Sequence, residues 1–390
     1  MRSFVRAIPL SFQHVFAMFG ATVLVPFLTG LDPGSTLVAS GVGTIIFHLI
    51  TRGKVPTYLG SSFAFIAPLT LFVSKQHAPG QAVTGLISVS IVYGILSLVI
   101  ASIGVARVRK AIPPVVVGPV VAIIGLSLAQ TAIQSEASTH WDVAIVSLLA
   151  AILASLVGPK QMRLIPILFG IVIGYVYSII RGGLVDFSGV RTASWVQLPH
   201  FQAPSFSWSV ILAMAPIALV TFVEDLGHMF VLTEITEKDV VKNPGFSSIL
   251  LGNGVATFVS ALLGGPAQTT YAENLGVLAM TRQFSSRIIQ GAAVIAIILG
   301  LLGKFGALIH SIPTAVMGGI GILLYGMIAA MGIRHMIEEK VNLANMKNLI
   351  IVAVIFIVGV GYANNGIAYA TIAGLLIYWL IPNLGNKTEK

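Results

Sequence analysis

Three acidic residues, Glu224, Asp225 and Glu273, fall inside apolar stretches, whereas nearly all other Asp and Glu residues lie in connecting segments or at segment ends. A carboxylate at the centre of a bilayer costs at least about 2.5–3.5 kcal/mol, so one within a membrane-crossing segment is a functional candidate. Glu224 and His228 are four residues apart and therefore share one helix face. Shielded from water, such a pair can take up a proton on one side of a membrane and release it on the other.

The Glu224–His228 pair could instead be purely structural and hold two helices together. Asp225 is rotated by about 100° from Glu224 on a helix, so it faces elsewhere, and a structural role is its main interpretation.

Two apolar segments are interrupted at their starts. The first follows Pro56 and covers residues 58–65, and the second follows a Gly-Gly-Pro sequence and covers residues 267–274. Irregular backbone within a membrane is tolerated only where it is buried in protein or lines a cavity. Paired interruptions in two halves of a chain are typical of the central binding site of a secondary transporter. The alternative is that Gly and Pro are simply common in membrane helices.

A half-helix that begins within the membrane presents backbone N–H groups without intrahelical partners. Two such ends would donate hydrogen bonds to carbonyl or anionic oxygens, so the sequence predicts a site for a small polar molecule. Glu273 opens the second half-helix. Phe63, Tyr271 and Tyr325 are candidate walls for a planar ring, and core packing is the alternative for each.

The other polar residues within apolar segments give weaker signals. Gln13 and His14, early in the first apolar segment, either reach the site or only bond across helices. No His, Asp or Glu cluster has metal-ligand spacing, and nothing like a nucleophile elbow surrounds Ser61. We therefore expect no metal, no cofactor and no enzymatic activity.

Composition indicates why these segments must lie in a lipid bilayer. Hydrophobic residues make up 56% of the 390 and charged residues only 9%, with a mean hydropathy of +0.96. Soluble domains carry about 25% charged residues. Apolar runs of about 20 residues, the length that crosses a bilayer, recur from end to end. The first run, from near Ile8, lacks the cleavage site of a signal peptide. The absence of Cys excludes disulfides and thiolate chemistry.

The charges predict the orientation of the chain. We count fourteen apolar segments, which start near residues 8, 34, 60, 81, 113, 142, 162, 208, 246, 269, 285, 313, 346 and 366. When the connecting segments are assigned alternately to the two sides, all Lys and Arg residues but Lys75, Arg181, Arg191 and Lys304 lie on the side of both termini. Cytoplasmic loops attract this excess, so both termini are predicted to be cytoplasmic. The net charge of +9 then reflects topology and indicates no nucleic-acid partner.

The fold predicted in this way is an all-α polytopic membrane protein. Segments 3 and 10 are the two broken half-helices that form the central site. Seven segments per half is an odd number, so the second half would be inverted relative to the first.

At this point the chain resembles the nucleobase–ascorbate transporter (nucleobase:cation symporter 2) family, and within it the bacterial uracil permeases. Residues 273–282 (ENLGVLAMTR) fit the family signature of Glu or Gln, Asn, any residue, Gly, four residues, Thr and a basic residue. Supporting matches are Gln13-His14, residues 60–65 (GSSFAF) and the Glu224…His228 pair. They occur in order along essentially the whole chain.

The resemblance implies fourteen helices in two inverted repeats of seven, and a homodimer in the cell membrane. A core domain would comprise residues 1–110 (segments 1–4) and 206–311 (segments 8–11). A gate domain would comprise residues 111–205 (segments 5–7) and 312–390 (segments 12–14). The substrate would be carried between core and gate.

It also implies roles for individual residues. Glu224 and Glu273 would hydrogen-bond a nucleobase, with the backbone amides of Phe63 and Ala272 contributing, and His228 would tune or share the coupling proton with Glu224. Phe63 and Tyr325 would flank the ring. The remaining candidates near the site are Tyr271 and Asn274 for substrate binding, and Gln13, His14, Ser61, Ser62 and Asp225 in support.

The expected activity is proton-coupled import of uracil by alternating access. Glu at position 273 is typical of uracil transporters, whereas purine-type members tend to carry Gln there. Ala272 departs from the Gly more common in uracil members, which leaves other pyrimidines open. The alternatives are a purine or xanthine permease of the same fold, and an uncoupled facilitator or channel. Na⁺ could replace H⁺, although no dedicated Na⁺ cage is apparent. An inorganic-anion exchanger is disfavoured because two buried carboxylates would repel the anion.

Overall fold

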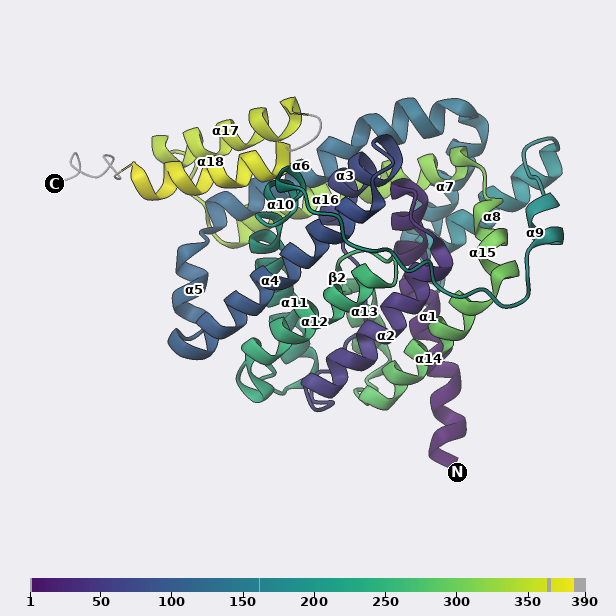
Figure 1. Ribbon diagram of the computed structural model, residues 1–390, viewed down its shortest axis with the longest axis horizontal. Coiled ribbons are helices and arrows are strands. Elements are labelled where there is room, and N and C mark those ends of the chain that lie inside the picture. The colour runs from purple at the N-terminus through teal and green to yellow at the C-terminus, as the bar shows by residue number, and fades with distance from the viewer. Residues whose placement is uncertain (1, 161, 363–365, 382–390) are drawn as a thin grey trace.

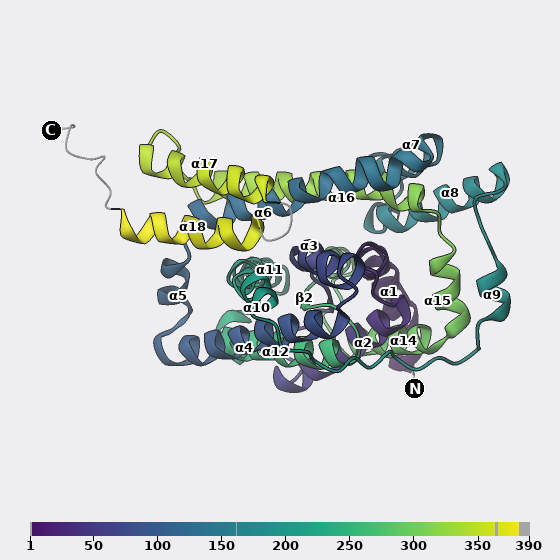
Figure 2. The same cartoon turned by 45° about the horizontal axis from the view of Figure 1, so that its top comes forward.

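The helices of this protein form two layers (Figures 1 and 2). The computed structural model describes residues 2–160, 162–362 and 366–381. The first layer contains α1 (Arg2–Thr29), α2 (Pro33–Ile50), α3 (Ile66–Leu69), α4 (Pro79–Ile103), α10 (Trp208–Met214), α11 (Ile217–Thr236), α12 (Phe246–Leu262), α13 (Ala272–Thr281) and α14 (Ser286–Leu301). The second layer contains α6 (Pro114–Gln130), α7 (Trp141–Leu156), α8 (Pro166–Arg181), α16 (Thr314–Glu338), α17 (Met346–Gly361) and α18 (Gly366–Leu380).

Short helices connect the layers or flank them. These are α5 (Val105–Ala111), α9 (Ser188–Thr192) and α15 (Gly303–His310). Three π-helical segments, Thr70–Lys75, Thr131–Glu136 and Val241–Gly245, and three 3₁₀ turns, Phe63–Phe65, Ala137–Thr139 and Met162–Leu164, complete the helical structure of the described residues.

Local sequence explains where several helices begin. Proline occupies the first turn of α2, α4, α6 and α8, where its missing N–H would have had no helical partner. Asp32 caps α2 by accepting a hydrogen bond of 2.6 Å from the Ser35 N–H. Partial burial raises the pKa of Asp32, but the His310 imidazole, 3.9 Å away, and the hydrogen bonding of Ser35 outweigh it and lower this pKa to about 2. The cap is therefore ionised at neutral pH and also ties α15 to the start of α2.

Seven helical stretches of the described residues are long and apolar enough to cross a membrane. They are Ile8–Thr29, Pro33–Ile50, Pro79–Ile103, Pro114–Thr139, Trp208–Thr236, Val241–Leu262 and Thr314–Glu338. This confirms the predicted helical, polytopic membrane class. The other apolar helices have 10–17 residues, so the count of fourteen crossings stays a prediction. Lys387 and Lys390, two of the charges used to predict the topology, lie outside the described residues.

Both interrupted segments form short β-strands inside the first layer. Strand β1 (Leu59–Ser61) pairs antiparallel with β2 (Gln268–Thr270), with Gly60 opposite Thr269. Proline shortly before each strand disfavours a helix that would begin earlier. The two strands make a ribbon from opposite halves of the chain, and each strand leads directly into a half-helix.

The outer edges of this ribbon are completed by threonine side chains. In a bilayer, unpaired strand edges are not tolerated, because no water is present to hydrogen-bond them. Thr44 of α2 accepts a hydrogen bond from the Leu59 N–H (3.0 Å) and donates one to the Leu59 carbonyl (3.3 Å). Thr257 of α12 does the same for Gln268, at 3.0 and 3.4 Å. A threonine side chain thus completes the outer edge of one strand in each half of the chain.

Gly60 lets a tyrosine ring lie directly against the ribbon. A Cβ at this position would be 2.2 Å from the ring of Tyr271, which no side chain tolerates. Tyr271 is buried, donates a hydrogen bond to the Ser61 carbonyl (3.2 Å) and accepts one from the Thr22 hydroxyl (3.3 Å). Tyr271 therefore locks β1 to the start of α13.

We predict that Gly60→Ala destabilises the protein by about 1–3 kcal/mol, the usual cost of overpacking, because the new methyl group displaces Tyr271. Thermal unfolding in detergent should show a lower Tm. Gly94→Ala in α4 is the matched control, since a Cβ at Gly94 has open space around it. Equal Tm values for the two variants would contradict the assigned role of Gly60.

Candidate functional site

The ribbon places the beginnings of two half-helices at its opposite ends. Phe63 begins a 3₁₀ turn directly after β1, and Ala272 begins α13 directly after β2. Neither preceding residue, Ser62 or Tyr271, caps its helix with a side-chain hydrogen bond. In the described structure, no N-cap side chain therefore satisfies the first N–H groups of either helix. Ala272 is exposed and Phe63 is half-buried, so these donors lie beside accessible space.

Two carboxylates lie close to these helix ends. Glu224 is on α11, which packs against both α13 and the 3₁₀ turn at Phe63. Glu273 is in the first turn of α13, where the helix dipole favours its negative charge. The two carboxylates interact electrostatically. Glu224 is exposed and Glu273 is half-buried, and neither side chain makes a recorded hydrogen bond to another residue in the described part of the chain. Both are therefore open to a ligand.

His228 shares a helix face with Glu224, and its hydrogen-bond partner in the structure is Thr270. Its Nδ1 lies 2.9 Å from the hydroxyl of Thr270, at the end of β2. No hydrogen bond or ion pair joins His228 to Glu224 among the residues that the structure describes. The two side chains share a helix face, but the nearby Thr270 hydroxyl is the partner of the imidazole.

Asp225 is buried beneath the site and hydrogen-bonded to the ribbon. Its Oδ1 accepts from the hydroxyls of Thr269 (2.9 Å) and Thr270 (2.7 Å) and from the Thr270 N–H (3.2 Å). Its Oδ2 accepts from the side-chain amide of Asn253 on α12 (2.7 Å). The rotation between Glu224 and Asp225 thus separates an open carboxylate from one that is hydrogen-bonded to β2 and α12.

Asn274 and His14 form a second buried contact. The Asn274 Nδ2 lies 3.0 Å from His14 Nδ1 and 3.1 Å from the His14 carbonyl oxygen, and both residues are buried. The Asn274 side chain therefore ties α13 to α1. Gln13 is half-buried beside this contact. Ser61 and Ser62 are buried, with no hydrogen-bond partner for either hydroxyl in the described structure.

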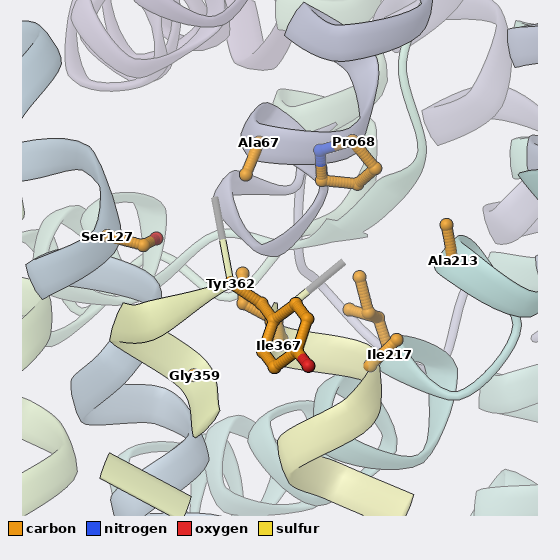
Figure 3. A pocket seen from close by; sticks show the side chains of 10 residues that line it. Ala67, Pro68, Ser127, Ala213, Ile217, Gly359, Tyr362 and Ile367 are labelled. Atoms are coloured by element: carbon orange, nitrogen blue, oxygen red, sulfur yellow. The ribbon is translucent and has the colours of Figure 1, made fainter. Parts of the chain in front are cut away.

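Tyr325 comes from the second layer. It is buried in α16 and lines a cavity of about 50 Å³ together with Ile66 and Ala67 of α3 and Thr131 of the second layer. A smaller cavity, drawn in Figure 3, shares Ala67 with it and is lined on its other sides by Ile217 of α11 and Ile367 of α18. Both cavities thus lie where the layers meet beside the first half-helix, and neither includes Glu224 or Glu273.

Sequence reasoning missed two polar residues. Thr270 joins His228 to Asp225, and its position in the interrupted segment, three residues before Glu273, was the available signal. Glu136 is buried like Asp225. It lies within the apolar stretch Pro114–Thr139, and its Oε2 has no partner among the described residues. Its position at the end of an apolar segment gives no signal in the sequence that it is buried.

The fold and the open polar site together define a polytopic membrane transporter. The family model Xan_ur_permease, described as "Permease family", matches residues 5–365. The chain belongs to this permease family, and it is a transporter and not an enzyme.

Several known proteins are similar to the chain over nearly their whole length. It is 45% identical to "Uracil permease" of Bacillus caldolyticus, over 98% of this chain and 93% of that protein. It is 40% identical to "Uracil permease" of Escherichia coli (strain K12), over 97% and 92%. It is 37% identical to "Putative pyrimidine permease RutG" of the same strain, over 97% and 90%.

Solved structures share the fold at low sequence identity. The transmembrane domain of the cyanobacterial bicarbonate transporter BicA has a TM-score of 0.67 at 16% identity and covers 97% of both chains. SLC26A9 has a TM-score of 0.74 at 12% identity, over 97% of this chain and 65% of that one.

Neutralising Asp225 and neutralising Glu224, which are neighbours on α11, should have very different effects on the stability of the protein. We predict that Asp225→Asn destabilises the protein by about 3 kcal/mol or more, because it leaves an amide N–H₂ group facing buried donors. Glu224→Gln should change stability by less than about 0.5 kcal/mol, since this exposed side chain makes no comparable contacts. Thermal unfolding of both variants in detergent measures the difference. A Tm for Asp225→Asn equal to that of Glu224→Gln would be inconsistent with the hydrogen-bonding role of Asp225.

Proposed function

We propose that this permease imports uracil together with protons by alternating access. The observation that carries the proposal is the pair of open carboxylates, Glu224 and Glu273, beside the two uncapped helix ends at Phe63 and Ala272. Carboxylates accept and helix N-termini donate, so the site offers both halves of a hydrogen-bonding pattern. Relatives that bear the name uracil permease cover nearly the whole chain, which supports this choice of substrate.

Uracil fits this arrangement because its ring alternates N–H donors with carbonyl acceptors. Glu224 and Glu273 accept from the ring N–H groups, and the amides of Phe63 and Ala272 donate to the carbonyls. The Phe63 ring flanks one face of the base, and Tyr325 approaches from the second layer. Tyr271 and Asn274 support the site indirectly. Tyr271 holds the ribbon in place, and Asn274 holds α13 against α1.

Proton coupling is assigned to Glu224, with His228 beside it. A protonated Glu224 binds the base tightly, and loss of the proton towards the cytoplasm lowers the affinity and releases the base. Exposed residues continue on the same face of α11 at Gly227, Val231 and Glu234. With the predicted orientation, this face leads from Glu224 towards the cytoplasm and supports a release route on that side.

The proposed architecture is fourteen crossings in two inverted repeats of seven. The parallel roles of Thr44 on α2 and Thr257 on α12 support the repeat, because each completes the strand of its own half. The two layers support the division into a core (residues 1–110 and 206–311) and a gate (111–205 and 312–390) (Figure 2). We further propose a homodimer in the cell membrane with both termini cytoplasmic.

Uptake of labelled uracil into proteoliposomes tests the function. With purified protein and an inward proton gradient, we predict accumulation that is lost without the gradient and in Glu224→Gln. A roughly tenfold excess of unlabelled xanthine, enough to displace a competing substrate by mass action, should leave uptake unchanged.

The uptake experiment distinguishes the proposed function from each alternative. Inhibition by xanthine would indicate a purine-type permease of the same fold. Rapid uptake by Glu224→Gln that ignores the gradient would indicate an uncoupled facilitator or channel. Absence of uracil uptake would refute the substrate and make Ala272, beside the proposed base, the first residue to replace.

A further inference from the structure

Asp225, Thr270 and His228 form a continuous chain of hydrogen bonds from the buried ribbon to the open site. Asp225 is completely buried, Thr270 is 1% exposed and His228 is half-buried. This series of hydrogen bonds therefore begins at Asp225, which no ligand reaches, and ends at His228, which a ligand can reach. Among the described residues, no hydrogen bond links His228 to Glu224. The hydrogen bonds through Thr270 therefore determine which imidazole nitrogen carries the hydrogen.

The direction of these hydrogen bonds is fixed at Asp225. The carboxylate receives four donors: the Thr270 N–H, the hydroxyls of Thr269 and Thr270, and the amide of Asn253. A backbone N–H can only donate, and an ionised carboxylate can only accept, at about four lone-pair positions. Oδ1 receives three of these donors and Oδ2 receives one, and together they stabilise the ionised form of Asp225. The ionised carboxylate has no proton to donate, so the Thr270 hydroxyl proton points towards Oδ1.

The Thr270 hydroxyl therefore determines the state of His228. A hydroxyl has one proton to donate, and Thr270 uses it on Asp225 at 2.7 Å. Towards His228 Nδ1, 2.9 Å away, the same oxygen can only accept. Nδ1 must then carry a hydrogen, and in the neutral ring the lone pair is on Nε2.

We infer that Thr270 and Asp225 are positioning residues that hold His228 in its Nδ1–H form and present Nε2 as a hydrogen-bond acceptor at the site. Glu224 lies one helical turn away on the same face of α11. Nε2 thus accepts a hydrogen bond from protonated Glu224 or from a ring N–H of the substrate. The consequence for uracil rests on the proposed function, whereas the form of the imidazole does not.

The form of the imidazole can be observed directly by NMR. Protein with ¹⁵N-labelled histidine, in lipid nanodiscs at a pH where His228 is neutral, gives ring ¹H–¹⁵N correlations that distinguish the two tautomers, and His228→Gln identifies the signal. We expect Nδ1–H with an unprotonated Nε2 in the unaltered protein. Thr270→Val removes the hydroxyl acceptor and leaves only the Thr270 backbone carbonyl beside the imidazole, so it should reduce the Nδ1–H signal. Thr270→Ser keeps the hydroxyl and should retain the signal.

Thr257→Val is the matched control. It deletes the hydroxyl that completes the other end of β2, on Gln268, and has no contact with His228. A merely structural role for Thr270 would affect the two valine variants alike. The inference is overturned if His228 carries its hydrogen on Nε2 in the unaltered protein. It is also overturned if the pattern is unchanged in Thr270→Val or disappears in Thr257→Val.

Binding of uracil gives a second readout. Thr270→Val should weaken binding about tenfold, equivalent to about 1.4 kcal/mol, and Thr270→Ser by less than about threefold. Equal affinities in the unaltered protein and Thr270→Val would overturn the positioning role. If the expected tautomer is seen but uracil does not bind the unaltered protein, the proposed function fails and the assignment of the imidazole stands.

Discussion

The structure depends on satisfying backbone hydrogen bonds in two places where the chain is not helical inside the membrane. A strand in hydrocarbon must find partners for every N–H and carbonyl, and water is not available to supply them. This protein pairs β1 with β2 and then covers the outer edges with Thr44 and Thr257. The ribbon can therefore lie deep in the protein without exposing polar backbone to lipid.

The site follows from that solution. Because each strand ends within the protein, each following helix also begins there, and its first N–H groups face accessible space instead of solvent at a membrane surface. The same ribbon determines which carboxylate of α11 is hydrogen-bonded within the protein and which stays open. Asp225 is used to hold β2, whereas Glu224, one residue earlier, is left open. One turn of α11 thus carries both a structural carboxylate and an open one, because adjacent side chains diverge by about 100°.

Much of this arrangement could be predicted from the sequence, because its signals were local. Pro56 and the Gly-Gly-Pro sequence before Ala267 marked the interruptions, and the polar residues that followed them marked the half-helices. The structural interpretation of Asp225 needed only the helical rotation. What the sequence could not supply was the choice among several possible hydrogen-bond partners. Glu224 and His228 have ideal spacing for a pair, yet His228 bonds to Thr270, which is distant in sequence and becomes adjacent only when β2 is formed. Tyr271 was a candidate wall for the ligand and is instead packed onto Gly60, a contact between the two halves that no local pattern contains.

The pairing of Leu59 with Thr270 also has a consequence for biosynthesis. At the usual rates of translation, the ribosome reaches Thr270 about 10–40 s after Leu59. During that interval the first half is already inserted, and the inner edge of β1 has no strand beside it. The nascent chain must therefore keep this edge shielded, by the translocation machinery or by temporary helix contacts, until the second half arrives. The pair of half-helix ends is thus a late product of assembly. A chain interrupted before β2 would leave an unpaired strand edge in the bilayer, which membrane quality-control proteases could recognise.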